Sequence, residues 1–270
     1  MLKEEDASSL FGGLLMELAN GLRRSILLKL DENSEKLSKI ATELNMTIQE
    51  AHRNVARLIA SGLVEKNSAN YLSITPFGKM IIKQVSGLDF IVENKDYFNN
   101  HNLGNLPVKF IQRLGALQNS QIVHGIGPVL ERWKTMFLDT KKYMYIITSQ
   151  YPVDVAATVV VKAQEGIQIS YIFGENTIVP RERSQLLKKS SWKEQISKGT
   201  IHRKMLPDVQ VCVSVTENQA CVFFPNLNGE ADVTSVFFSK DPCFQEWCYD
   251  FFNYQWEQAD VFDETKLRET

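Results

Sequence analysis

Three side chains that carry hydrogen-bonding groups suited to the edges of DNA bases lie close together: Gln49, His52 and Arg53. A Gln amide can bond adenine through two hydrogen bonds, and an Arg guanidinium can bond guanine in the same way. Three nearby side chains carry a hydroxyl or a cation and suit phosphate oxygens: Thr47, Arg57 and Lys66. We therefore expect the first set to read bases and the second set to hold phosphates.

A single amphipathic helix would place the base-reading residues on one face. An apolar face recurs at helical spacing and consists of Ile48, Ala51, Val55, Leu58 and Ile59. Thr47 with Glu50 three residues later matches a capping box, and Gly62 suits the helix end. As a cap partner, Glu50 would repel phosphate little; projecting outward, it would repel phosphate.

A shorter helix precedes this one. Its apolar positions are Leu37, Ile40, Ala41 and Leu44, with Asn33 or Ser34 as N-cap. The turn at Asn45-Met46 joins the two helices, which together predict a helix-turn-helix. A further apolar stripe predicts an earlier helix with a break at Gly21; its members are Leu14, Leu18, Leu22, Ile26 and Leu30.

A hairpin follows, with strands over 63–66 and 71–75, and Pro76 begins another helix. Residues 58–66, "LIASGLVEK", resemble the L-x-x-x-G-L-V-x-K/R signature of winged-helix regulators. Residues 71–78, "YLSITPFG", are similar to the Y-x-L-T-x-x-G end of their wing. The resemblance covers about residues 10–95 and implies a winged helix that binds double-stranded DNA. The alternative is a winged helix for protein contacts alone, but such a face normally carries more apolar residues.

The helix after the wing continues beyond what one small core requires. Its apolar positions are Phe77, Met80, Ile81, Val85, Leu88 and Ile91. We expect this segment to pair with its twin in a homodimer, and a two-fold dimer matches a palindromic operator. The alternative is that it packs against the protein's own C-terminal domain.

The C-terminal half alternates strands and helices, which predicts parallel strands joined by crossover helices. We expect strands at 143–149, 167–174, 200–206 and 231–239, a hairpin over 209–226, and helices at 107–123, 125–142, 153–166, 181–199 and 243–262. In the hairpin, a turn at Glu217-Asn218 would place Ser214 opposite Cys221. The last helix is strongly aromatic.

This half resembles a family of archaeal transcriptional regulators, the one named after the methanogenesis regulator of filament-forming methanogens. The resemblance rests on the order of elements, on 228–232 "NGEAD" before a strand, and on 241–247 "DPCFQEW" opening the last helix. It implies transcription control by a winged helix with a C-terminal effector module. We therefore expect an α+β or α/β chain of two domains: a winged helix-turn-helix over 1–95, a helical linker over 96–140 and a mixed α/β sheet domain over 141–270.

The effector module predicts a small-molecule site of unidentified chemistry. Ligands in open α/β sheets bind at the carboxyl ends of strands, and polar side chains near strand ends are Ser149, His202 and Arg203. Trp247 and Phe251 recur at i and i+4 in the last helix. That spacing is more typical of a core face than of a ligand pocket, which remains the alternative.

One further motif could do phosphoryl chemistry. His202, Lys204 and Asp208 form H-x-K-x3-D, whereas phospholipase-D-like hydrolases use H-x-K-x4-D, with His as nucleophile or acid and Lys holding the phosphate. The spacing is one residue short and only one copy is present. No metal spacing links the four His and four Cys residues. We expect neither an enzyme nor a cofactor or metal.

Composition limits the location and the partners. The 270 residues carry a formal charge of −2, but residues 20–85 hold ten Lys or Arg against six Asp or Glu. That local excess suits a DNA-binding surface. The opening "MLKEEDASSL" lacks the apolar region of a signal peptide, and no apolar run is long enough to span a membrane. We expect a cytoplasmic protein with reduced thiols.

Overall fold

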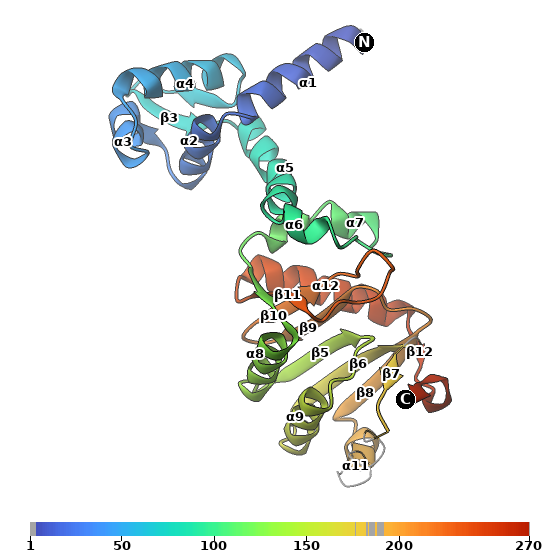
Figure 1. Cartoon of the computed structure of the whole chain (residues 1–270). Coiled ribbons are helices and arrows are strands. Elements are labelled where there is room, and N and C mark those ends of the chain that lie inside the picture. The colour runs from blue at the N-terminus through green and yellow to red at the C-terminus, as the bar shows by residue number, and fades with distance from the viewer. Residues whose placement is uncertain (1–3, 176, 182, 184–186, 188–191, 270) are drawn as a thin grey trace. The chain divides into compact units, whose positions relative to one another are not determined.

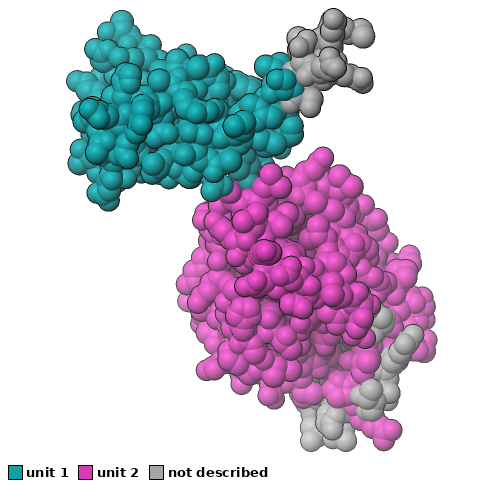
Figure 2. Space-filling view, turned by 45° about the horizontal axis from the view of Figure 1, so that its top comes forward, with its two compact units in different colours: residues 1–86 teal, residues 87–270 magenta. Residues whose placement is uncertain are grey.

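The computed structural model describes residues 4–175, 177–181, 183, 187 and 192–269. The chain forms two compact units, unit 1 over Met1–Ser86 and unit 2 over Gly87–Thr270 (Figure 2). Both combine helices with a β-sheet, so the expected mixed α/β class is confirmed.

Unit 1 contains a small antiparallel sheet of strand order β1-β3-β2 and the helices around it. Its elements are α1 (Glu4–Leu18), α2 (Gly21–Glu32), β1 (Glu35–Lys36), α3 (Leu37–Glu43), α4 (Ile48–Ala60), β2 (Val64–Lys66), β3 (Tyr71–Ile74) and the first part of α5 (Pro76–Glu93). Buried aliphatic side chains from all the helices and from β2 and β3 form one core.

The helices and the hairpin of unit 1 lie where the sequence predicts them. The break between α1 and α2 falls at Asn20, whose side chain accepts a hydrogen bond from the Arg23 amide. Strand β1 was not expected, since two residues carry no periodic signal, and it pairs with Tyr71 and Leu72 of β3. As a result Lys36, rather than Asn33 or Ser34, is the N-cap of α3.

Gly78 allows α5 to approach the hairpin closely. Its amide donates to Thr75 Oγ1 at 2.9 Å, and the Thr75 hydroxyl donates to the Gly62 carbonyl at 2.7 Å. A side chain at position 78 would overlap the Leu63 carbonyl oxygen. This packing explains the glycine at the end of the wing motif.

Unit 2 is built on an eight-stranded mixed sheet of order β12-β8-β6-β5-β9-β10-β11-β4. Strands β5, β6 and β8 pair in parallel, as expected from the crossover helices, and their other neighbours pair antiparallel. The strands are β4 (Gln121–His124), β5 (Tyr143–Thr148), β6 (Gln168–Gly174), β8 (Ile201–Leu206), β9 (Cys212–Thr216), β10 (Ala220–Phe223), β11 (Ser235–Ser239) and β12 (Asp260–Val261).

Helices cover both faces of this sheet. Helices α8 (Ile126–Leu138), α9 (Val153–Gln164) and α11 (Trp192–Ser197) lie on one face, and α12 (Pro242–Gln258) lies on the other (Figure 1). The remaining elements are α6 (Lys95–Phe98), α7 (Val108–Ile111), the 3-10 helices η1 (Leu114–Leu117) and η2 (Glu264–Lys266), and the strand pair β7 (Ile178–Val179) and β13 (Arg268–Glu269).

Two expectations for the middle of the chain need correction. The segment 107–123 is not one helix, because it divides into α7, η1 and the edge strand β4, which pairs with β11. The segment 96–140 does not act as a linker between cores, since its buried Phe110, Trp133 and Phe137 belong to the core of unit 2. The spacing of the apolar residues in the sequence fits both the expected and the observed arrangement, so it could not distinguish them.

The hairpin register is confirmed, because Ser214 lies opposite Cys221. Ser214 accepts a hydrogen bond from Trp133 Nε1 at 3.0 Å, which joins α8 to the sheet. Cys221 is fully buried, as a small apolar residue would be. Of the helix expected over 181–199, α11 is described, and much of the rest lies outside the described residues.

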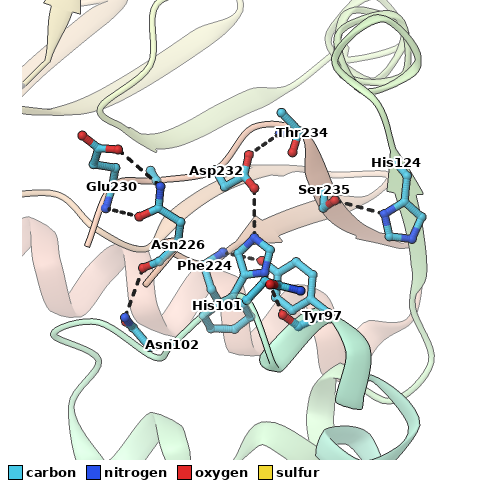
Figure 3. Close-up of polar contacts among 12 residues, drawn as sticks. Tyr97, His101, Asn102, His124, Phe224, Asn226, Glu230, Asp232, Thr234 and Ser235 are labelled. Atoms are coloured by element: carbon cyan, nitrogen blue, oxygen red, sulfur yellow. Dashed lines mark hydrogen bonds and ion pairs between the residues drawn. The ribbon is translucent and has the colours of Figure 1, made fainter. Parts of the chain in front are cut away.

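A polar cluster attaches the segment after α6 to the loop between β10 and β11 (Figure 3). The His101 ring stacks on Tyr97 at 3.7 Å, and its two nitrogens face the Tyr97 carbonyl at 2.8 Å and Asp232 Oδ2 at 3.0 Å. Burial raises the pKa of the Asp232 carboxyl, but hydrogen bonds from Thr234 and His101 outweigh that effect and lower the pKa overall.

We predict a pH-dependent contribution of Asp232 to stability. A carboxyl with a lowered folded pKa stabilises the fold above its ordinary pKa of about 4, and this contribution is lost as pH falls through the lowered value. The difference in free energy of unfolding between the wild type and Asp232→Asn, measured with urea between about pH 3 and 6, should therefore shrink towards low pH. Asp96→Asn, at an exposed position of α6, is the control; an equal pH trend there would contradict the assignment.

Candidate nucleic-acid interface

Helix α4 begins with the capping box that the sequence predicts. Thr47 Oγ1 accepts from the Glu50 amide at 3.2 Å, and the Glu50 carboxylate accepts from the Thr47 amide at 2.9 Å. These hydrogen bonds lower the pKa of Glu50, with the Thr47 amide as the largest cause. Glu50 is thus a cap partner, and the alternative of an outward carboxylate that repels phosphate is not what the structure shows.

The exposed face of α4 presents the three predicted base-reading residues together. Gln49, His52 and Arg53 are exposed and, with Ile48, line one shallow hollow. The opposite face buries Ala51, Val55 and Leu58 in the core. Ile48 and Ile59, which we assigned to the apolar face, are instead 53% and 39% exposed and flank it.

A groove of about 370 Å³ runs between α4 and the β2-β3 hairpin. Lys66 and His52 line it, as does Lys36 of β1. The Lys36 ammonium lies 5.3 Å from the centre of the Tyr71 ring, a cation–π distance. Lys36 and Tyr71 were not among the predicted site residues, because only the long-range pairing of β1 with β3 brings these two residues together.

The structure gives Thr47 a role that differs from the predicted one. Its hydroxyl donates to Glu50 Oε2 at 2.8 Å, so its one proton is already used. A hydroxyl has one donor, and a phosphate oxygen needs that donor. Thr47 therefore positions the start of α4, and its predicted phosphate contact would require the hydroxyl to leave Glu50 Oε2.

Arg57 is also engaged inside unit 1. Its guanidinium donates from Nη2 to Glu17 Oε1 at 2.6 Å and from Nε to both oxygens at 3.1 and 3.2 Å. Arg23 Nε lies 2.8 Å from Glu17 Oε2. These contacts lower the pKa of Glu17, with the Arg57 hydrogen bond as the largest cause. Arg57 thus ties α4 to α1, and 55% of its side chain remains exposed.

The carboxylates of unit 1 form ion pairs mainly with cations outside α4. Glu43 of α3 lies 3.0 Å from Lys29 of α2, and Glu35 pairs with Lys39. Within the described part of the chain the structure assigns no ion pair to Arg53 or Lys66. The positive charge around α4 is therefore left available for a polyanion.

The predicted ligand residues of unit 2 do not meet in one pocket. Trp247 and Phe251 are fully buried, and Trp247 Nε1 donates to the Phe110 carbonyl at 3.1 Å, so both are core residues. His202 and Arg203 are consecutive in β8 and project to opposite faces. Ser149 is buried beside Cys212, with 3.9 Å between Oγ and Sγ.

The H-x-K-x3-D residues are also placed by β8 and the loop after it. Lys204 Nζ donates to the Trp256 carbonyl at 2.7 Å, which ties β8 to the end of α12, and His202 is exposed. The expectation that the chain is not an enzyme stays a prediction. Among the described residues no group of His, Cys, Asp and Glu could hold a metal ion.

Comparison with protein-family models gives no match, and neither does comparison with curated proteins. Among solved structures the chain is similar to TrmBL2, described as an archaeal chromatin protein that shows a novel mode of DNA binding. Sequence identity is 12%, the TM-score is 0.42, and the match covers 90% of this chain and 94% of that one.

Two further solved structures show partial similarity. Nuc from Salmonella typhimurium, a phospholipase D family member, matches 54% of this chain and 99% of its own, with 12% identity and a TM-score of 0.40. The S-adenosylmethionine-dependent methyltransferase SibL matches 75% and 65%, with 12% identity and a TM-score of 0.28. All three TM-scores are below 0.5, so these likenesses establish neither a family nor an activity. Among the described residues, no helix has the length and apolar character that a membrane crossing requires.

Proposed function

We propose that the chain is a DNA-binding transcriptional regulator, with unit 1 as a winged helix that binds a double-stranded operator. The observation that carries the proposal is the exposed face of α4. It places Gln49, His52 and Arg53 side by side on a helix whose other face is buried. A helix of this kind fits the major groove, and the adjacent hairpin would contact the backbone.

The order of elements supports the winged-helix assignment. Helices α2, α3 and α4 are followed by the β2-β3 hairpin, and β1 completes a three-stranded sheet. Lys66 and Lys36, on the hairpin side of the groove, take the phosphate contacts in this proposal, while Thr47 and Arg57 position α4. The resemblance of the motifs in 58–78 to winged-helix regulators agrees with this role and does not specify the operator.

The alternative is an interaction module that uses the same face to bind a protein. Fluorescence anisotropy with a duplex from the protein's own promoter and a scrambled duplex, each at about 50 and 200 mM salt, separates the two. Phosphate neutralisation predicts affinity that falls steeply with salt, whereas a protein-contact module predicts little or no DNA binding. A screen of random duplexes completes the test, and absence of salt-dependent binding to every selected duplex would reject the proposal.

We predict that Arg53→Ala weakens binding to the specific duplex by about 1 to 3 kcal/mol and relaxes base preference at one position, as expected for a base-reading arginine. The matched control is Arg57→Ala on the same helix, because its guanidinium is bound to Glu17. That change should lower the free energy of unfolding but alter base preference less. Equal weakening by Arg53→Ala on specific and random duplexes would show that Arg53 does not read bases.

We propose further that the chain is a homodimer, which would match a palindromic operator, and that α1 takes part with α5. Leu10, Phe11 and Phe77 line one groove of about 640 Å³ in unit 1, and each is at least 44% exposed. Met80, Leu88 and Val92 of α5 are 60% exposed or more. Apolar surface of this extent on helices normally marks an interface.

We predict that Phe11→Glu raises the dimer dissociation constant at least about tenfold, since it would bury an unpaired charge in the interface. Sedimentation velocity over a concentration series measures this. Leu28→Glu is the control, because Leu28 is exposed on α2 but does not line the groove. A monomeric wild type, or an equal effect of the two variants, would contradict the proposed interface.

A further inference from the structure

Two arginines of unit 2 hold one carboxylate from the C-terminal segment. Glu264 of η2 bonds Arg183 through Oε1 and lies 3.2 Å from Arg203 Nη1 through Oε2. Arg183 is buried, with 5% of its surface exposed, whereas the Glu264 side chain is 52% exposed. The Arg183 guanidinium is thus buried, and the Glu264 carboxylate lies between the arginines and solvent.

The two arginines offer more donors than Glu264 can satisfy. Its two oxygens are each used by one arginine. Within the part of the chain that the structure describes, the buried Arg183 Nε has no hydrogen-bond partner. Native proteins rarely leave a buried charged donor unpaired, because the loss is large. The Arg183 Nε–H is therefore a donor that Glu264 leaves unsatisfied.

Aromatic rings surround this pair of arginines. Arg203 lies in β8 beside Tyr171 of β6, and Arg183 lies 5.4 Å from the ring centre of Tyr151, just after β5. Tyr151 follows the carboxyl end of β5, whereas Arg203 is the third of the six residues of β8. In the free protein Phe262, which belongs to the same segment as Glu264, covers Arg203, with 4.1 Å between its ring centre and the guanidinium carbon.

The segment that covers the arginines is held by short pairings. Strand β12 contributes two residues beside β8, and β13 contributes two residues beside β7. Lys266 forms an ion pair with Glu175, and both of these side chains are partly exposed. Phe262 and Leu267 pack against the core of unit 2 but are only partly buried. A segment held by short pairings and partly buried side chains detaches at a lower free energy than the core unfolds.

We propose that Arg183 and Arg203 form a binding site for the phosphate group of a small phosphomonoester, and that Glu264 occupies this site in the free protein. A phosphate has three terminal oxygens, so it can accept from both guanidiniums and from the unpaired Nε. The guanidinium fork suits phosphate geometry, and a dianion attracts two cations more strongly than one carboxylate does. Binding would displace Glu264 and release the segment 260–269.

This inference deepens the sensing part of the proposed function and relies on it only for the regulatory consequence. The test therefore contains no DNA. Calorimetric titration of the full chain with glycerol 3-phosphate, inorganic phosphate and succinate, each at constant ionic strength, compares phosphate with carboxylate. Failure here would leave DNA binding by α4 untouched, and failure of DNA binding would leave this site untouched.

Glu264→Gln removes the competing charge and should tighten glycerol 3-phosphate binding at least about tenfold, because the binding-competent state becomes more populated. Asp260→Asn is the matched control, since it removes the same charge from an exposed residue of the same segment. It should leave the affinity unchanged. Arg203→Met in the Glu264→Gln background should abolish binding.

Equal affinity of Glu264→Gln and Asp260→Asn would overturn the proposal, and so would binding that survives Arg203→Met. Succinate binding as tightly as glycerol 3-phosphate would overturn the phosphate assignment. Hydrogen exchange of the wild type provides a readout that needs no variant. Amides of 260–269 should exchange several-fold faster with glycerol 3-phosphate present, and unchanged exchange at saturation would reject displacement of Glu264.

Discussion

Trp247→Ala should lower the free energy of unfolding of unit 2 by about 3 to 5 kcal/mol, the range for truncating a large buried aromatic residue. Trp247 has no exposed surface and stacks against Phe251, with 5.7 Å between ring centres. Its ring meets Phe110 edge-on, and its Nε1 hydrogen bond to the Phe110 carbonyl would also be lost. Urea unfolding followed by far-ultraviolet circular dichroism measures the change.

Trp256→Ala provides the comparison on the same helix. Trp256 is partly exposed and stacks on Phe252, so its removal leaves a smaller cavity and should cost clearly less. The two substitutions also distinguish a core residue from a ligand contact. If Trp247→Ala lowered the free energy of unfolding by less than about 1 kcal/mol, the core assignment would be wrong. The alternative from the sequence, a ligand pocket that contains Trp247, would then be supported.

Gly78→Ala should destabilise unit 1 by about 3 kcal/mol, near the upper end for overpacking. The added methyl would overlap the Leu63 carbonyl oxygen and lie 2.8 Å from Ile74 Cγ1. The Leu63 oxygen belongs to the backbone and also accepts the Thr75 amide, so it cannot rotate away. The start of α5 or the hairpin must shift, and DNA affinity should fall with stability because Lys66 lies on that hairpin.

The matched control is Gly21→Ala at the start of α2. No atom lies within 4 Å of the position of its added methyl. Alanine in a helix is favoured over glycine by roughly 0.5 to 1 kcal/mol, so this variant should be as stable as the wild type or more so. The melting temperatures of both variants, measured by thermal unfolding, test this prediction. A Gly78→Ala protein that melts at the wild-type temperature would contradict the close packing.

Local chemistry made much of unit 1 predictable. Thr47 and Glu50 lie three residues apart, so a short-range rule identified the start of α4, and Gly62 with φ 72° ends it as expected. The hairpin register around Ser214 followed from turn length in the same way. These features depend on neighbours in the chain and therefore leave a readable pattern.

Features that depend on distant partners could not be read in this way. Arg57 is bound by Glu17, forty residues earlier. Because the sequence of α4 does not indicate this partner, Arg57 looked available for a phosphate. Arg203 meets Glu264 across 61 residues, and nothing in the local sequence indicates that pairing. Strand β4 looked helical because its pairing with β11 is long-range.

The carboxylate of Glu17 belongs to two surfaces at once. It lines the apolar groove of α1 that we assign to the dimer, and it holds Arg57 of α4. Partner subunit and operator would therefore act on the same ion pair. Thermodynamic linkage makes such an effect reciprocal: if dimerisation tightens operator binding by some factor, operator binding tightens dimerisation by that factor. The assembly state of this protein would then report whether DNA is bound.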